Sequence, residues 1–475
     1  TNDYVLTVDA NGDAGWEAAS SGVSSDAQYN TAGGTNAGDS FTGTDATSNT
    51  LFGYNAGTAI TSGDTNTVVG KDALQACDTG SANVAIGETA LRACTTGGSN
   101  VSIGTESSRT LTTGGYNVAV GESALYANNG TSNVAVGAYA LRANTSPSNN
   151  TAVGYEALTA NTTAEKNTAL GKQAGKSMTT GGFNTAIGAY AVDNCTTGTY
   201  NTGVGVWTIR DLTTGNYNTA LGGRASMEMT TGSNNTSVGY QALFANTTGG
   251  SNTAVGSNCL PALTTSTSTT ALGTNAGSAV TTSGETVIIG AQTGTSLTTG
   301  SSNTLIGAYA GRSVTTGTSN VCVGQDSFRY GTGGSNTCIG RAAGDISSFT
   351  GSNNLILGNT ADPSAADVSN EITLGNSSIT KFRIPGLSFT IDSTNISAAN
   401  NILPSANNSK NLGSSSLRWA NLYVNDMHFS NEGKTGGNDI DGTTGNWTLQ
   451  EGADHLYIIN NKTGKRYKMG LQEVD

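Results

Sequence analysis

The sequence has little charge, little proline and almost no histidine. Of 475 residues, 11% are charged, 5 are proline and 2 are histidine. It contains no run of about 18 apolar residues, so no membrane insertion is expected. The formal net charge is −12, and Lys and Arg do not cluster along the chain. Because phosphate binding needs clustered cations, a nucleic-acid partner is not expected either.

What the sequence does contain is a repeat. The phrase Asn-Thr-Ala-(Val/Leu/Ile)-Gly returns every 17 residues, at 150–154, 167–171 and 184–188. Its closing glycine marks nineteen coils between Gly53 and Gly358, with two 16-residue steps and one 18-residue step. The residues that define the structural repeat are Asn150, Asn167, Asn184, Gly154, Gly171 and Gly188. Such a period predicts a solenoid in which each coil stacks on its neighbours.

The alternation before each closing glycine predicts a short strand in every coil. We expect the Val/Ile positions to point into the coil's own core and the intervening Ala to face a close neighbour. The later Thr-Thr-Gly triplet predicts a turn in which glycine supplies a positive φ. The Asn that opens the phrase predicts a ladder of stacked amides. The predicted fold class is therefore all-β, a parallel β-solenoid of about 17 residues per coil.

This repeat resembles the Ser-Val-Ala-Ile-Gly repeat of the left-handed β-roll heads of trimeric autotransporter adhesins. The resemblance covers about two thirds of the chain and implies three parallel chains packed through small residues, that is, a homotrimer.

The ends of the chain have a different character. Residues 1–48 form an acidic N-terminal connector, the shaft covers 49–360, transition strands cover 361–402, and a C-terminal fibre-end domain covers 403–475. The opening segment, the stretch 403–424 and the stretch 447–475 resemble segments of phage tail fibres. The resemblance implies a homotrimer that joins other tail or fibre proteins at its N-terminal end and contacts a host-surface glycan or protein.

Catalytic and metal chemistry has few residues to draw on. The six cysteines show no CxxC spacing and no neighbouring His, so neither a zinc site nor a disulfide framework is expected. No metal and no cofactor are predicted. Two pairs, Cys77 with Cys94 (17 residues apart) and Cys322 with Cys338 (16 apart), should stack on adjacent coils as buried free thiols, with a disulfide as the alternative. The carboxylates that could form a glycosidase pair are Glu88 with Glu106 and Glu122, and Glu156 with Glu165. Solvated charges on turns are the simpler interpretation, and no enzyme is expected.

The function predicted from the sequence is a structural and adhesive component of a phage tail fibre, located in the virion tail. The alternative is an extracellular adhesin or self-assembling filament at a cell surface, and a less favoured one is a tailspike-type polysaccharide depolymerase. Trp447, His455 and Tyr457 are the candidate receptor contacts, because aromatic and ionisable side chains gather where the period ends. A role in plugging the end of the trimer is the competing interpretation.

Overall fold

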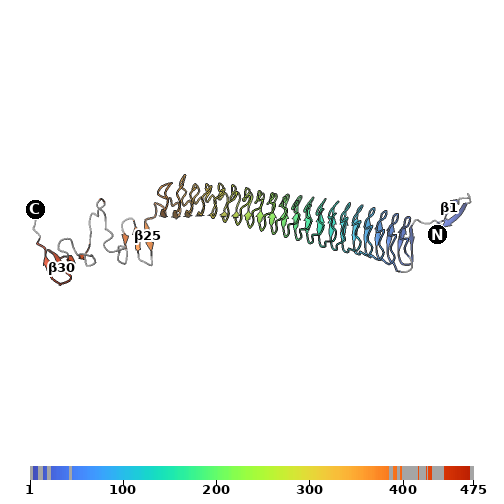
Figure 1. The fold of residues 1–475 in the computed structure, drawn as a ribbon, viewed down its shortest axis with the longest axis horizontal. Helices are drawn as coiled ribbons and strands as arrows, with labels where there is room; N and C mark the ends of the chain where they lie inside the picture. Colours follow the sequence, from blue (N-terminus) through green and yellow to red (C-terminus); the bar gives the residue numbers. More distant parts are fainter. Residues whose placement is uncertain are drawn as a thin grey trace. The chain divides into compact units, whose positions relative to one another are not determined.

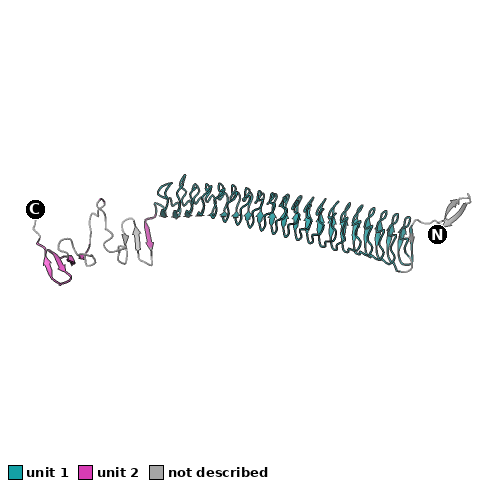
Figure 2. Cartoon of the chain, in the orientation of Figure 1, with its two compact units in different colours: residues 1–378 teal, residues 379–475 magenta. Residues whose placement is uncertain are grey.

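The computed structural model describes residues 4–8, 14–18, 23–41, 45–384, 389–392, 396–397, 416, 424, 426–430 and 443–470. The chain divides into two compact units, Thr1–Ser378 and Ile379–Asp475 (Figure 2). Within the described residues, every regular element is a β-strand.

The first unit is dominated by a stack of short parallel strands, each paired with the next in the sequence (Figure 1). These strands are β4 (Thr31–Gly33), β5 (Thr50–Phe52), β6 (Thr67–Val69), β7 (Val84–Ile86), β8 (Val101–Ile103), β9 (Val118–Val120), β10 (Val134–Val136), β11 (Thr151–Val153), β12 (Thr168–Leu170), β13 (Thr185–Ile187), β14 (Thr202–Val204), β15 (Thr219–Leu221), β16 (Thr236–Val238), β17 (Thr253–Val255), β18 (Thr270–Leu272), β19 (Val287–Ile289), β20 (Thr304–Ile306), β21 (Val321–Val323), β22 (Thr337–Ile339), β23 (Leu355–Leu357) and β24 (Ile372–Leu374). A short antiparallel strand, β3 (Val23–Ser25), pairs with β4 at one end.

The register of the stack follows the sequence repeat. Thr151, Ala152 and Val153 pair with Thr168, Ala169 and Leu170, and the same relation holds from coil to coil. With about 4.8 Å between neighbouring strands, twenty steps give a shaft of roughly 95 Å. The predicted parallel β-solenoid is confirmed.

The stack is longer than the marked glycines predict. At the C-terminal end, β23 pairs with β24 with a 17-residue offset, and Gly375 follows Gly358 at the same spacing. At the N-terminal end, β4 pairs with β5, and Gly34 takes the closing-glycine conformation. The expectation that the period ends at Gly358 is therefore wrong. The N-terminal coil carries Asn30-Thr31-Ala32, but Gly33 stands where the other strands end in a large apolar residue, and Gly34 lies 19 residues before Gly53. In the C-terminal coil, Glu371 stands where the phrase has Asn.

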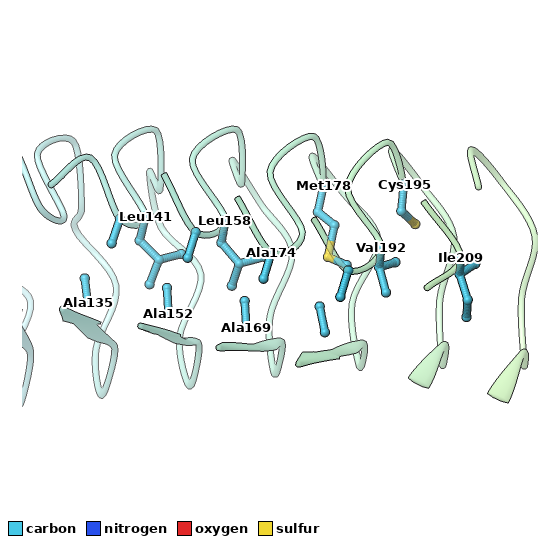
Figure 3. Packing of buried hydrophobic residues seen from close by; sticks show 14 of the residues in the cluster. Ala135, Leu141, Ala152, Leu158, Ala169, Ala174, Met178, Val192, Cys195 and Ile209 are labelled. Carbon is cyan, nitrogen blue, oxygen red and sulfur yellow. The ribbon is translucent and has the colours of Figure 1, made fainter. Parts of the chain in front are cut away.

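The predicted orientation of the strand is also wrong. In β11 the middle residue, Ala152, is fully buried, whereas Thr151 and Val153 are only partly buried. The same pattern holds in every strand from β5 to β23. The interior of a coil is narrow, and the large side chains that fill it come from the turn opposite the strand. Leu141 and Leu158 point from that turn toward the strand (Figure 3). Little more than a methyl group fits on the strand side, so the larger aliphatic residues lie on the outer face.

Coils with a large middle residue demonstrate this limit on space. Ile288 and Leu305 occupy the middle of β19 and β20. The turn residues that would otherwise contribute a leucine are there glycines, Gly277, Gly294 and Gly311. A Cβ on Gly277 would lie 2.9 Å from Ile288 Cδ1, and one on Gly294 would lie 2.9 Å from Leu305 Cδ1. In these coils the large core side chain comes from the strand instead of the turn, so the core stays filled, as close packing requires.

Two classes of glycine allow the coils to stack. Gly171 has φ of 137°, and a Cβ there would lie 2.6 Å from the carbonyl carbon of Gly188. Gly181, in the Thr-Thr-Gly triplet, does not supply the positive φ predicted for it, which falls instead on Phe183 at 61°. Gly181 is required for another reason, since its Cβ would lie 2.1 Å from the carbonyl oxygen of Gly198.

The predicted asparagine ladder is confirmed. Asn167 is buried, and its Oδ1 accepts the backbone N–H of Asn184 at 2.9 Å. Its Nδ2 donates to the carbonyl of Gly181 at 3.1 Å. Thr269 and Thr286 replace Asn at two successive steps, and Thr269 Oγ1 donates to Ser283 O at 2.9 Å in the same way. The ladder thus satisfies buried turn groups that the strand pairs do not reach.

The remaining strands are antiparallel. In the first unit, β1 (Tyr4–Val8) and β2 (Ala14–Ala18) form a hairpin. In the second unit, a three-stranded sheet contains β25 (Lys381–Ile384), β26 (Phe389–Asp392) and β27 (Ile396–Ser397). A four-stranded sheet contains β28 (Asp426–Ser430), β29 (Asn446–Glu451), β30 (Leu456–Asn460) and β31 (Arg466–Lys468), paired in that order.

Candidate functional site

The first candidate surface is the outer sheet face of the shaft, defined as the first and third residues of strands β5 to β24. The first residues are Thr, Val, Leu or Ile, and the third are Phe, Val, Ile or Leu, so the face carries no charged side chain. Several of the third residues are strongly exposed, for example Leu170 at 48%, Leu221 at 49% and Leu272 at 47%. An uncharged aliphatic strip of this length is typical of a surface that another molecule covers.

The second candidate surface is the four-stranded sheet that holds the predicted receptor contacts. Trp447 lies in β29 opposite Phe429 and Asn460. Tyr457 lies in β30 opposite Gln450 and Lys468. Because side chains alternate between the faces of a strand, Trp447 and Tyr457 point to opposite faces.

The predicted contact residues are therefore only partly brought together. His455 lies in the turn before β30, which Gly452 closes by donating its N–H to the His455 carbonyl at 2.8 Å. The rings of His455 and Tyr457 meet edge to face with centroids 6.5 Å apart. Trp447 instead packs on Tyr467, with centroids 5.9 Å apart. His455 and Tyr457 form one small surface, and Trp447 belongs to another.

The face that holds Trp447 is apolar and was not predicted. We call it the terminal apolar face. Its members are Met427, Phe429, Trp447, Leu449, Ile458 and Tyr467. Phe429 is 51% exposed and Tyr467 48% exposed. The alternation Met427-x-Phe429 and Trp447-x-Leu449 is the sequence signal that could have revealed this face.

The opposite face is polar at its centre. Thr448 is buried, and its Oγ1 lies 2.6 Å from His428 Nδ1. Asn461 Nδ2 donates to the same hydroxyl at 2.9 Å. His428 is thus tied into a hydrogen-bonded group that spans β28, β29 and the residue after β30.

The carboxylates considered for glycosidase chemistry all have polar partners. Glu88 lies 3.3 Å from Lys71 Nζ, and Glu106 lies 2.7 Å from Arg109 Nη1. Glu122 accepts the Tyr139 hydroxyl at 3.0 Å, and Glu165 lies 3.7 Å from Lys166 Nζ.

Glu156 is the most strongly held of these carboxylates. Hydrogen bonds from Gln173 and then from Lys176 lower its pKa to about 2. A general acid needs a raised pKa, so Glu156 is perturbed in the direction opposite to that role.

All six cysteines are buried and free, which confirms the expectation of free thiols for the pairs Cys77/Cys94 and Cys322/Cys338. Cys77 and Cys94 occupy equivalent positions in adjacent coils, and Cys322 lies directly opposite Cys338 in neighbouring strands. Burial raises the pKa of Cys195 to about 11 and that of Cys338 to about 12. Cys195 and Cys338 therefore stay protonated at neutral pH, and all six buried side chains fill space in the core.

In the described part of the chain, no group of three His, Cys, Asp or Glu side chains is placed to hold a metal ion. Apart from Ser416 and Val424, the stretch 403–424 lies outside the described residues. Among the described residues there is also no helix long and apolar enough to cross a membrane. Comparison of the chain with protein-family models, with curated proteins and with solved structures found no match.

Proposed function

We propose that this chain is the shaft and end subunit of a homotrimeric phage tail fibre that attaches to a host surface. The observation that carries the structural part of this proposal is the uninterrupted, in-register stack from β4 to β24. Each coil contacts only its neighbours, so the stack extends in one direction without a change of cross-section. Such a body suits a spacer that holds a binding end away from its attachment point.

The outer sheet face supports the oligomer. It presents two uncharged columns along the stack, and a partner that covers them needs the same length and the same 17-residue period. A second and a third copy of this chain meet that requirement in every coil. The terminal apolar face supports the oligomer in the same way. A single-layer sheet is marginally stable in water, and packing against other copies of the chain would stabilise it.

Sequence resemblance supports the assignment to phage. The opening segment, the stretch 403–424 and the stretch 447–475 resemble tail-fibre segments. A cell-surface adhesin or filament is the second candidate, because the shaft repeat resembles the heads of trimeric adhesins. The small surface of His455 and Tyr457 is our candidate for contact with the receptor.

Substitutions on the outer sheet face test the oligomer. In Val153→Asp/Val255→Asp, carboxylates replace partly buried aliphatic side chains of that face. We expect circular dichroism to show an intact β-solenoid, while light scattering shows the mass of one chain instead of three. The control is Tyr155→Asp/Ser257→Asp, which adds the same charge at exposed turn positions and should remain trimeric. A wild-type protein with the mass of one chain would contradict the homotrimer.

Attachment assays test the adhesive end. We expect His455→Ala/Tyr457→Ala to fold normally and to lose binding to susceptible cells, whereas Trp447→Ala should act through assembly. Full attachment by the folded double variant would rule out this contact surface.

Antibody labelling of phage particles separates the two candidates, since label on the tail supports the fibre and label on uninfected cells supports the adhesin.

A further inference from the structure

The shaft sorts most of its cations onto one line. Seven of the twelve Lys and Arg residues between 53 and 358 stand five positions after a closing glycine. We call this line the cation column, and its members are Arg92, Arg109, Arg142, Lys176, Arg210, Arg312 and Arg329. Equivalent positions are stacked, as shown by the backbone bonds from Ala76 N to Arg92 O and from Ala93 N to Arg109 O, both 3.0 Å. The linear sequence hides this column because its members lie 17 or more residues apart.

Part of the column is neutralised by carboxylates. Arg210 holds Asp211 through two bonds, at 2.8 and 2.7 Å. Arg329 lies 3.2 Å from Asp326, and Lys176 lies 2.9 Å from Glu156. These cations have their charge compensated within the chain.

The segment from Arg92 to Arg142 differs. Arg92 is exposed and donates its Nε to Gln75 Oε1 at 3.1 Å. Arg142 is exposed and lies over the rings of Tyr126 and Tyr139, at 5.9 and 5.5 Å. Among the described residues, neither guanidinium has a carboxylate within salt-bridge distance. Arg109, between them, holds the carboxylate of Glu106.

A hollow lies beside these arginines. Gln75, Ala76, Arg92, Ala93, Arg109 and Thr110 line an open depression of about 320 Å³. The small side chains of Ala76 and Ala93 make room for this depression. The guanidinium groups of Arg92 and Arg109 and the amide of Gln75 border it. In the next coil, Tyr126 presents a ring that Arg109 and Arg142 flank, at 5.8 and 5.9 Å.

We infer that this segment of the cation column binds an acidic glycan, with a sugar carboxylate or phosphate held by Arg92 and Arg109. Guanidinium groups bind such anions through paired, charge-assisted hydrogen bonds. Gln75 offers an amide to a sugar hydroxyl, and the Tyr126 ring offers an apolar surface to a sugar face. The volume is at the lower end of small-molecule sites, which suits one sugar unit of a longer polymer.

A nucleic acid fits this surface less well. Strong binding of a phosphate backbone requires many cations along its path, and this segment has three arginines, one of them paired with Glu106. Glu88 and Glu122 directly follow the closing glycines of coils in this segment, and Glu106 lies two residues after another. A polyanion of high charge density would meet these carboxylates, whereas a sugar with a single charge need not.

The site does not depend on the proposed trimer or on the proposed receptor contact, since all of its residues come from consecutive coils of one chain.

Binding of the full-length protein to immobilised polymers tests this inference. The probes are polygalacturonate for carboxylate, its methyl ester for the neutral polymer, a glycerol-phosphate teichoic acid for phosphate, and a single-stranded oligonucleotide. We expect binding to polygalacturonate or to the teichoic acid, at least tenfold weaker binding to the ester, and at least tenfold weaker binding by Arg92→Gln/Arg109→Gln. Arg92→Lys/Arg109→Lys keeps the charge but loses the paired donors, so it should fall between that variant and the wild type.

The matched control is Arg210→Gln/Arg329→Gln, which removes two cations of the same column that do not line the depression. It should bind like the wild type at equal salt. Equal losses in both Gln variants would show general electrostatic attraction and overturn the site. The site is likewise overturned if the wild type binds neither anionic glycan, if it binds the ester equally well, or if the oligonucleotide binds more tightly and depends on Arg92 and Arg109.

Discussion

The shaft and the four-stranded terminal sheet are both built from short β-strands, but they bury side chains very differently. The coil 154–170 buries six side chains, those of Ala157, Leu158, Asn161, Ala164, Asn167 and Ala169. Among the described residues of the second unit, Thr448 alone is buried. A coil therefore completes its core with its own turn and its two neighbours, whereas the apolar face of the sheet stays partly exposed. The first arrangement buries its core within one chain, whereas the second leaves Phe429 51% exposed and Tyr467 48% exposed.

Changing the register of the shaft should have the largest effect. Deletion of residues 150–166 removes one coil and restores the 17-residue spacing, so folding and thermal stability should be nearly unchanged. Deletion of residues 150–157 places strand positions against turn positions and exposes the core, so cooperative unfolding should be lost. Thermal melts followed by circular dichroism compare the two. Equal melting temperatures would mean that the shaft is not held together by stacked coils.

A methyl group on a closing glycine should have the next largest effect. In Gly171→Ala, the new Cβ meets the backbone of Gly188 at 2.6 Å in a residue with φ of 137°. We expect a loss of about 2–4 kcal/mol in the free energy of unfolding. Gly223→Ala is the control, because its nearest contact is Tyr240 Cδ2 at 3.7 Å. Denaturant titration checks both, and a stable Gly171→Ala would show that neighbouring coils do not need this close approach.

The asparagine ladder comes third. Asn167→Ala leaves the Asn184 N–H without its buried side-chain acceptor, and the Gly181 carbonyl keeps only the Asn184 amide of its two side-chain donors. The expected cost is about 1–3 kcal/mol. Asn167→Thr should cost less, since Thr269 and Thr286 occupy this position in the native chain. If Ala and Thr variants unfold at the same denaturant concentration, the ladder does not contribute through its hydrogen bonds.

In the terminal sheet, loss of a buried hydrogen-bonding side chain should have a smaller and more local effect on stability. Thr448→Ala removes the hydroxyl that joins His428 and Asn461. We expect a loss of about 1 kcal/mol, confined to the sheet. Amide hydrogen exchange should accelerate in 446–460 and stay unchanged in the shaft. Acceleration that spreads into the coils would show that the shaft and the sheet unfold together, and the two regions would then not differ in how they are stabilised.

The smallest expected effect is a pH dependence near the C-terminal end of the shaft. Burial raises the pKa of Asp345 from 3.8 to about 6, and its Oδ1 has no hydrogen-bond partner among the described residues. Between these two values the unfolded chain releases a proton that the folded chain keeps, so stability falls as pH rises from about 4 to about 6 and the penalty persists above that. Asp345→Asn should therefore raise the melting temperature at pH 8 and leave it unchanged near pH 3. A difference at pH 3 as large as that at pH 8 would exclude ionisation as the cause.

Much of the shaft could be predicted because its information is local and repeated. The glycine period predicts the stacking, and the Asn at a constant offset predicts the ladder. The candidate site could be predicted less well. Trp447 and Tyr457 are both aromatic and lie in the same segment, but strand register places them on opposite faces of the sheet. The composition of a segment does not reveal its strand register.

The sequence by itself determined the period, the parallel stacking and the line of asparagines, because a repeat of constant length brings equivalent residues to equivalent places. Only the tertiary structure decided which face of each strand is inside. Alternation marks two faces without saying which is buried, and the answer depends on Leu158 filling the core from the opposite turn so that Ala152, not Val153, faces inward. The cation column also emerged only on folding, since stacking brings together residues that the chain keeps a coil apart.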